Sequence, residues 1–494
     1  MRPIERMIDY VENRHPAAVS VCLFLVSFAL REVLELRVFP TVDNLNAPTV
    51  LFHFTYYSFS MIFLSALVGA LTRTPFFKAF RTVLFFYPVI LLSTLIDGFL
   101  LHGNTDYQFL SGDIVAVLTG GPQYFLADNP GQPLGLKIEV AAMLLMLAAY
   151  LWAKIGSLLR TAASFLVVYV LFFLFIAGTS VVGLGQNSLI MVASGNRVWE
   201  HTYFLICAEM AMITAAAVWF AANRNQFLAV VRNLRPTRLA GFLLFAAAGF
   251  LIRRGFQPFD LLTALLAVTF LWLSSVVTND IADVGIDRRT NRGRPLVRGI
   301  ITVREYWMVA AASALIAAAF SYVINPLALG LCAAILLLGL AYSFKPIRFR
   351  RYPFSTVMSG LGAGVAFLIG YMAATFSADI GESAIRFFAA IVVSTTLGYN
   401  VKDIKDMKGD KAEGVSTLLT VLGERRGKQA VALLLLASYP LFIILSGLAA
   451  LMPAALLAGI VSAFLVFRKP YSELPIMLVY VAFLSLCAYS LIGA

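Results

Sequence analysis

The sequence predicts an all-α, polytopic membrane protein with about fifteen transmembrane helices. Of its 494 residues, 60% are hydrophobic and only 13% are charged, and the mean hydropathy is +0.86. Soluble globular domains are roughly half apolar and a quarter charged. Apolar runs of about 17 to 25 residues, each long enough to cross a hydrocarbon core of roughly 30 Å, recur from Ala17 almost to Ala494.

The apolar runs form two groups on either side of the polar stretch 223–238. The first group predicts spans near residues 17–35, 49–71, 82–101, 139–158, 162–184 and 200–222. The second predicts spans near residues 239–253, 260–278, 306–324, 327–343, 354–376, 384–400, 428–449, 451–467 and 474–492. We therefore expect an N-terminal transmembrane module over residues 1–230 and a nine-helix domain over residues 231–494.

The net charge of +12 is interpreted as a property of a membrane protein rather than of a nucleic-acid binder. In so apolar a chain, basic residues gather at cytoplasmic helix ends, next to anionic lipid headgroups. The predicted partners therefore include membrane lipids and no nucleic acid. The four cysteines lie singly in apolar runs, so no zinc spacing or disulfide framework is expected.

The distribution of basic residues also predicts the orientation of the chain. If the N-terminus is cytoplasmic, the basic stretches 223–238, 288–298, 345–351 and 402–428 all fall on the cytoplasmic side. This satisfies the positive-inside rule. We therefore expect a multi-pass protein with its N-terminus and these loops in the cytoplasm.

Two acidic segments stand out in a chain with only 26 acidic residues. The first acidic segment, residues 279–287, reads NDIADVGID, and the second, residues 403–410, reads DIKDMKGD. Residues spaced three or four apart lie on one face of a helix. The carboxylates of each segment can therefore point together, and those of both segments can face one cavity.

So many carboxylates near a membrane are expected only where cations neutralise them. Magnesium takes oxygen ligands and commonly joins a few protein carboxylates to the phosphate oxygens of a substrate. A diphosphate fits two acidic segments better than a monophosphate, because it can bridge metals held by both. The other interpretation of either segment taken alone is a solvated transporter loop whose aspartates balance neighbouring arginines.

The first segment, continued as NDIADVGIDRRTNRGRP, resembles the first aspartate motif of the UbiA superfamily of intramembrane prenyltransferases. The stretch KDIKDMKGDKAEGVSTL is similar to the second. The family's nine-helix layout, with motifs after its second and sixth helices, matches the spans predicted for the second half of the chain. The resemblance implies a UbiA-type bundle with two magnesium ions and a bound diphosphate. The implied metal-site residues are Asn279, Asp280, Asp283, Asp287, Asp403, Asp406 and Asp410.

Basic and aromatic residues near the segments are candidates for binding the diphosphate. The stretch from Tyr342 to Lys345 is similar to the family's tyrosine-and-lysine segment, and a lysine or arginine suits a leaving diphosphate. The substrate-binding candidates are Asn279, Arg288, Arg294, Tyr342, Lys345 and Lys402. The catalytic candidates are Asp283, Asp287, Asp406, Asp410 and Lys345. Gly360, Gly362 and Gly364 are instead expected to serve close helix packing.

The resemblance implies magnesium-dependent transfer of a prenyl group from an isoprenoid diphosphate to a lipophilic acceptor, with likeness to digeranylgeranylglyceryl phosphate synthases and chlorophyll synthases. The acceptor remains open between an aromatic ring, a lipid hydroxyl and a sugar phosphate. One alternative is an intramembrane terpene cyclase. Another is a transporter or lipid-handling protein, which the intramembrane carboxylates Asp97 and Glu209 leave open. No motif names an activity for the first module.

Overall fold

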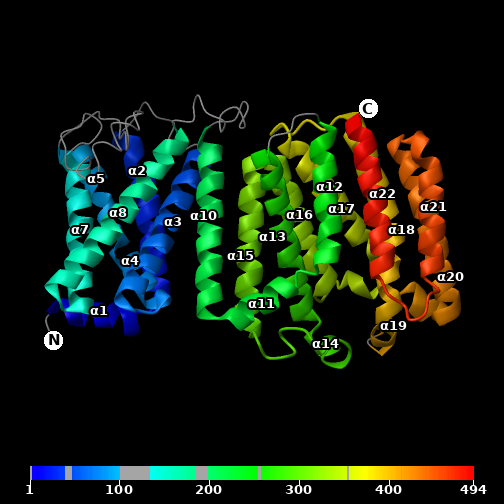
Figure 1. Cartoon of the computed structure of the whole chain (residues 1–494), viewed down its shortest axis with the longest axis horizontal. Helices are drawn as coiled ribbons and strands as arrows, with labels where there is room; N and C mark the ends of the chain where they lie inside the picture. The colour runs from blue at the N-terminus through cyan, green and yellow to red at the C-terminus, as the bar shows by residue number, and fades with distance from the viewer. Residues whose placement is uncertain are drawn as a thin grey trace. The chain divides into compact units, whose positions relative to one another are not determined.

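We describe the fold from a computed structural model of the chain. The described residues are 3–38, 47–100, 134–183, 199–253, 258–352, 355–412 and 414–493. Their regular secondary structure is entirely helical, and they divide into two compact units, Met1–Ala222 and Asn223–Ala494. Figure 1 shows long helices running side by side within each unit.

The N-terminal unit contains a helix on each of the six predicted spans. Its helices are α1 (Pro3–Asn13), α2 (Ala17–Val38), α3 (Ala47–Thr72), α4 (Phe76–Phe86), η1 (Tyr87–Ile90), α5 (Leu91–Leu95), η2 (Ile96–Leu100), α7 (Leu134–Ile155), α8 (Leu158–Gly183) and α10 (Trp199–Ala222). The third span is irregular, because Pro88 falls where α4 gives way to a 3₁₀ turn. A proline removes a backbone donor and breaks the regular α-helical pattern.

The described residues of the C-terminal unit form nine long helices, one on each predicted span. They are α12 (Pro236–Ile252), α13 (Pro258–Ala282), α15 (Val303–Ile324), α16 (Pro326–Ser343), α17 (Thr356–Ala373), α18 (Glu382–Gly398), α20 (Leu418–Ser446), α21 (Met452–Leu465) and α22 (Leu474–Gly493). Short helices join them: α11 (Arg224–Arg232), α14 (Val284–Thr290), η5 (Phe349–Arg351), η6 (Tyr399–Lys402), α19 (Asp403–Ala412) and η7 (Ala449–Leu451).

The helical membrane class is confirmed. Across the described residues, ten helices are long and apolar enough to cross a bilayer, or eleven if the bent pair α11 and α12 counts as one span. Four shorter apolar helices accompany them. The total of fifteen transmembrane helices stays a prediction.

Local sequence determines where several helices begin. At α15, the Thr302 hydroxyl accepts a hydrogen bond from the Glu305 backbone N–H, and the Glu305 carboxylate accepts one from the Thr302 N–H in return. At α16, Asn325 caps the first turn and Pro326 occupies the first helical position. Both arrangements satisfy backbone donors that the first turn of a helix leaves unpaired.

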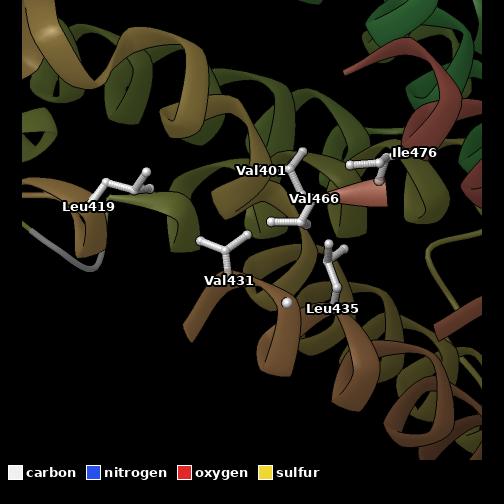
Figure 2. Close-up of a cluster of buried hydrophobic side chains, with 7 residues drawn as sticks. Val401, Leu419, Val431, Leu435, Val466 and Ile476 are labelled. Carbon is white, nitrogen blue, oxygen red and sulfur yellow. The ribbon is translucent and has the colours of Figure 1, made fainter. Parts of the chain in front are cut away.

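A buried apolar cluster holds the second acidic segment in place. Figure 2 shows side chains of η6, α20 and α22 converging on Val466 at the end of α21. Ile404 and Met407 of α19 pack against this cluster. The members of the cluster are Val401, Leu419, Val431, Ala432, Leu435, Val466 and Ile476. Because α19 is anchored by its apolar side chains, its carboxylates are left to face another way.

Glycines allow α17 to approach its neighbours closely. A Cβ atom on Gly360 would overlap the Val392 carbonyl oxygen of α18, and one on Gly364 would overlap the Phe388 ring. The expectation that these two glycines serve helix packing is confirmed. The contact between α17 and α12 is tighter still, because a Cβ on Gly249 or Gly370 would meet backbone atoms of the facing helix.

Replacing Gly370 with alanine should therefore destabilise the C-terminal unit by about 1 to 3 kcal/mol, since the new methyl group must push α12 and α17 apart. The expected readout is a lower melting temperature of the purified protein in detergent. Gly241→Ala on α12 is the matched control, because its Cβ would meet no heavy atom within 4 Å. If the two variants melt at the same temperature, the backbone contact at Gly370 is not as close as described.

Candidate active site

The first acidic segment lies at the junction of two helices. Helix α13 ends at Ala282, α14 begins at Val284, and Asp283 lies between them. Backbone hydrogen bonds from Asp283 N to Asn279 O and from Asp287 N to Asp283 O, both 2.9 Å, carry the helical turn across the junction. Asn279, Asp283 and Asp287 therefore lie one turn apart, and the Asn279 amide donates to the Asp283 carboxylate at 2.8 Å.

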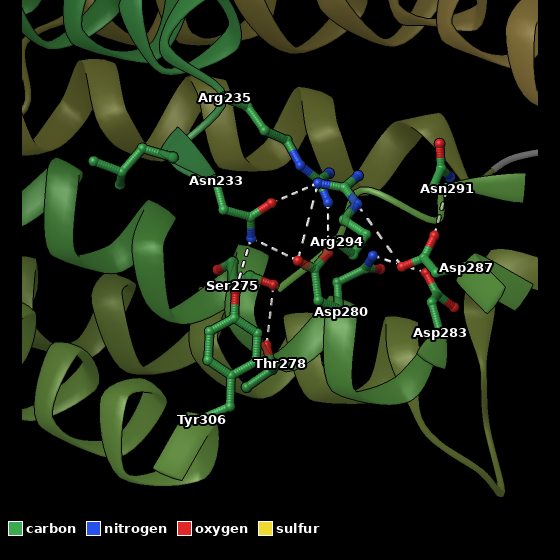
Figure 3. Close-up of polar contacts among 12 residues, drawn as sticks. Asn233, Arg235, Ser275, Thr278, Asp280, Asp283, Asp287, Asn291, Arg294 and Tyr306 are labelled. Carbon is green, nitrogen blue, oxygen red and sulfur yellow. Dashed lines mark hydrogen bonds and ion pairs between the residues drawn. The ribbon is translucent and has the colours of Figure 1, made fainter. Parts of the chain in front are cut away.

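Asp280 faces a different set of partners. Its side chain is 1% exposed, and its two oxygens accept hydrogen bonds from the Asn233 amide and the Arg235 guanidinium, each at 2.6 Å. The same Asn233 amide also donates to the Tyr306 hydroxyl at 2.8 Å. Figure 3 shows this group on one side of the segment, with Asp283 and Asp287 on the other.

Arg294 connects the two sides of the first segment. Its guanidinium lies 4.0 Å from an Asp280 oxygen and 3.8 Å from an Asp287 oxygen, and it donates to the Asn233 side chain at 2.7 Å. The Asn291 amide donates to the other Asp287 oxygen at 3.0 Å. An arginine can serve several acceptors at once because its donors are fixed in a planar fork.

The carboxylates of the second acidic segment come from α19. Asp403 and Asp410 are buried, with 6% and 5% exposed, whereas Asp406 is half-buried. Helix α19 contacts α14, so the two acidic segments are neighbours in space although they are far apart in the sequence.

Arg350 joins the two segments directly. Its guanidinium forms an ion pair with Asp283 of the first segment and lies 3.5 Å from an Asp410 oxygen of the second. Arg350 belongs to η5, on the loop that follows α16, and the adjacent Arg351 carbonyl accepts a hydrogen bond from Ser416 N just after α19. A single cationic side chain thus lies between carboxylates from both acidic segments.

Three further basic residues were predicted to bind the diphosphate, and only one of them, Lys402, has a partly buried side chain. Lys402 lies beside the second segment, where its ammonium is 3.4 Å from the Tyr342 hydroxyl and 5.5 Å from the centroid of the Tyr399 ring. Lys345 and Arg288 have exposed side chains. Within the described part of the chain, neither forms an ion pair with the aspartates.

Burial disfavours the charged form of these carboxylates unless a positive group lies beside them. Burial raises the pKa of Asp283 and Asp287 above the usual range for aspartate, although Arg350 and Asn291 act in the opposite direction. It raises the pKa of Asp410 to about 6. Burial opposes the charge on Arg350, but the combined attraction of Asp283, Tyr342, Asp410 and Asp406 outweighs it, so that the Arg350 pKa is raised. Such a group favours ligands that bring cations with them.

The residues that sequence reasoning missed are Asn233, Arg235 and Arg350. The first two belong to the polar stretch 223–238, which reads as a linker between two groups of spans. Arg350 lies among other basic residues in FKPIRFRR, and nothing in that pattern separates it from its neighbours. These three residues are distinguished only by their contacts with the aspartates. Because the aspartates are distant from them in the sequence, no local pattern could have identified these residues.

Removing the Asp280 charge should affect stability strongly. Asp280→Asn would leave Arg235 without its buried counter-ion, and breaking a buried ion pair costs about 3 kcal/mol or more. We expect a clearly lower melting temperature, and a partial recovery in the double variant Asp280→Asn/Arg235→Gln, which removes both charges. If the single variant melts like the wild type, the pair does not support the fold.

The model of the UbiA prenyltransferase family matches residues 242–490. The chain is 30% identical over 174 residues to 2-acylphloroglucinol 4-prenyltransferase of Humulus lupulus, covering 34% of this chain and 42% of that protein. It is 30% identical over 210 residues to digeranylgeranylglyceryl phosphate synthase of Natronomonas pharaonis, covering 41% of this chain and 72% of that protein.

Among solved structures, a UbiA homolog from Archaeoglobus fulgidus bound to GPP and Mg²⁺ matches with 21% identity and a TM-score of 0.44, over 54% of this chain and all of that one. The chain spans less than half the length of the plant relative.

Proposed function

Since the chain belongs to the UbiA prenyltransferase family, we propose that it transfers a prenyl group from an isoprenoid diphosphate to a lipophilic acceptor within the membrane. The observation that carries this proposal is the contact of Arg350 with Asp283 and Asp410. It places carboxylates of both acidic segments around one position where a cation is already held. A diphosphate accompanied by metal ions needs such a site.

The side chains present fit magnesium. The potential ligands are oxygens, which are what magnesium prefers, and Asp283 and Asp410 already share a cationic partner. The residues that would hold one ion at each segment are Asn279, Asp283, Asp287, Asp403, Asp406 and Asp410. When bound, magnesium would neutralise the diphosphate and stabilise the charge that develops as it leaves.

The basic side chains would hold and orient the diphosphate. Arg350 presents a planar fork that suits phosphate oxygens, and Arg294 and Lys402 lie beside the first and second segments. Lys345 and Arg288 stay predictions, because their exposed side chains would have to turn toward the donor. Asp280 contacts Asn233 and Arg235. These contacts support a role for Asp280 as a positioning residue that holds Arg294 beside Asp287.

In the proposed reaction, the bond between the prenyl C1 carbon and the diphosphate oxygen breaks. The acceptor forms a new bond to C1 and releases a proton, and the diphosphate departs with both electrons of the broken bond. The chain's part is to exclude water from the reacting carbon, because water would otherwise take the acceptor's place. We also propose that the acidic segments and the N-terminus face the cytoplasm, in accordance with the basic loops.

A screen of prenyl diphosphates against lipid and aromatic acceptors tests the proposal. The full chain, purified in lipid nanodiscs, should form a prenylated product only when magnesium, a donor and a suitable acceptor are all present. Chelation of magnesium should abolish the product. A cyclic hydrocarbon formed from geranylgeranyl diphosphate without any acceptor would contradict the transferase and favour a cyclase.

The structure also bears on the transport alternative. Asp97, one of the two intramembrane carboxylates on which that alternative rests, accepts a hydrogen bond from the Gly135 N–H at 2.7 Å. That N–H belongs to the first turn of α7, where backbone donors need an outside acceptor. We therefore assign Asp97 to the fold of the N-terminal unit rather than to an ion path.

A further inference from the structure

The N-terminal unit contains a cavity of about 390 Å³ between its helices. The walls are mostly apolar, with Met61 and Leu64 on α3, Met143 and Leu147 on α7, and Phe172 on α8. Cavities of this size and character are typical of sites for small apolar molecules, with a few polar groups fixing the orientation of the ligand.

Polar residues line part of this cavity, around Arg31 of α2. The Arg31 side chain is 1% exposed, its Nε donates to Glu35 at 2.7 Å, and one terminal nitrogen lies 3.6 Å from Glu139. The other terminal nitrogen is buried and has no hydrogen-bond partner among the described residues. The Arg31 guanidinium also lies over the Tyr57 ring, 5.1 Å from its centroid.

A second donor in the same wall has no partner either. The Tyr87 hydroxyl, from η1, is buried and makes no hydrogen bond within the described part of the chain. A buried donor left unpaired loses the hydrogen bonds that it makes to water in the unfolded chain, and the loss is greater for a charged group. Because both Arg31 and Tyr87 line the cavity, an oxygen atom of a ligand would satisfy donors that the protein leaves open.

The surrounding charges restrict what that oxygen can belong to. Glu35 and Glu139 share the single positive charge of Arg31, and Glu139 also accepts two hydrogen bonds from Ser93. A carboxylate or phosphate headgroup would be repelled by these two glutamates in a setting of low dielectric constant. An ammonium headgroup has no acceptor to offer Arg31 or Tyr87. A hydroxyl or carbonyl oxygen meets both requirements.

We infer that the N-terminal unit binds an uncharged amphipathic lipid, whose hydroxyl or carbonyl oxygen accepts hydrogen bonds from Arg31 and Tyr87 and whose hydrocarbon chain fills the cavity between α3, α7 and α8. This site lies in a different unit from the acidic segments. Its occupancy does not depend on the prenyl-transfer proposal.

Photo-crosslinking of the full chain in nanodiscs of zwitterionic phospholipid, which has no net charge, tests the site. The probe is a long-chain alcohol carrying a diazirine and an alkyne, compared with the fatty acid and the trimethylammonium amphiphile of the same length. The alcohol should label peptides of α3 and α7 about tenfold more than either charged probe, which corresponds to about 1.4 kcal/mol. Equal or stronger labelling by a charged probe would overturn the uncharged headgroup.

Two variants on α7 locate the labelling. Met143→Trp places a large side chain in the cavity wall and should abolish most of the labelling. Leu145→Trp, on a position that is 71% exposed and outside the cavity, is the matched control and should leave labelling unchanged. If the alcohol labels the Met143→Trp variant as strongly as the Leu145→Trp variant, the alcohol binds elsewhere.

A third variant tests the headgroup contact. Tyr87→Phe removes only the hydroxyl and keeps the ring, so the unit should fold as the wild type does. We expect the alcohol to label it about threefold less, and an alkane probe without oxygen to label both proteins equally. Unchanged labelling by the alcohol would show that Tyr87 makes no contact with the ligand oxygen. The effect is expected to be modest, because the net contribution of a single neutral hydrogen bond is small.

Discussion

Asp283→Ala is expected to lower the rate of prenyl transfer by about 100-fold or more. Asp283 accepts from Asn279, pairs with Arg350 and is proposed to hold a magnesium ion. A bound metal contributes several kcal/mol of charge stabilisation in a transition state. A loss of about 2.7 kcal/mol already corresponds to 100-fold in rate. The measurement is the initial rate of product formation at saturating magnesium and donor.

The control for this variant is Asp379→Ala. Asp379 is an exposed aspartate in the same unit, with 78% of its side chain accessible, and it pairs with Arg253 rather than with either acidic segment. We expect its rate to match the wild type. Asp406→Ala, in the second segment, should behave like Asp283→Ala. Full activity in both acidic-segment variants would contradict the site as described.

Arg350→Ala is expected to weaken donor binding by about 10- to 100-fold. The variant removes the only described side chain that contacts carboxylates of both segments, and a fork suited to phosphate oxygens. Its loss should therefore raise the KM for the prenyl diphosphate as well as lower kcat. Arg350→Lys keeps the positive charge without the fork, and it should recover only part of the affinity.

The adjacent Arg351 supplies the matched control. Its side chain is exposed, and its fold contact uses the backbone carbonyl, which Arg351→Ala retains. That variant should bind the donor normally. Equal KM values for the two alanine variants would mean that Arg350 does not touch the diphosphate and that its ion pairs serve the fold alone.

The helices were readable from the sequence because each is a long apolar run closed by polar residues or proline. The span predicted near residues 327–343 and the observed α16, Pro326–Ser343, differ by one residue, because Asn325 and Pro326 are strong start signals. The irregular third span was not readable in the same way. A hydropathy window does not separate the 3₁₀ turn at Pro88 from an uninterrupted helix.

The acidic segments were also readable, because aspartates at spacings of three and four form a local pattern. The contacts that the acidic segments make with other parts of the chain could not be predicted from the sequence. The prediction that all three carboxylates of the first segment point together failed to separate Asp280, which turns toward Asn233 and Arg235, from Asp283, which turns toward Arg350. Those partners come from distant loops, and only tertiary packing brings them to the segment.

The same limit applies to the N-terminal unit. Arg31 and Glu35 are four residues apart, so their pairing is visible as a helical pattern. Glu139 and Tyr87 come from other helices, and the cavity that they line with Arg31 is a property of the folded unit. An apolar sequence therefore gave no indication of a binding site there.

In the proposed site, the two acidic segments together bind the metal ions and the diphosphate. Titration of the full chain with Mn²⁺, followed by electron paramagnetic resonance in the presence of inorganic diphosphate, tests it most directly. We predict that Asp283→Asn and Asp410→Asn each weaken ion binding by about tenfold or more, and that the double variant loses less than the sum of the two free-energy changes, because neighbouring sites couple. Strictly additive losses, or a variant that binds like the wild type, would contradict a shared site.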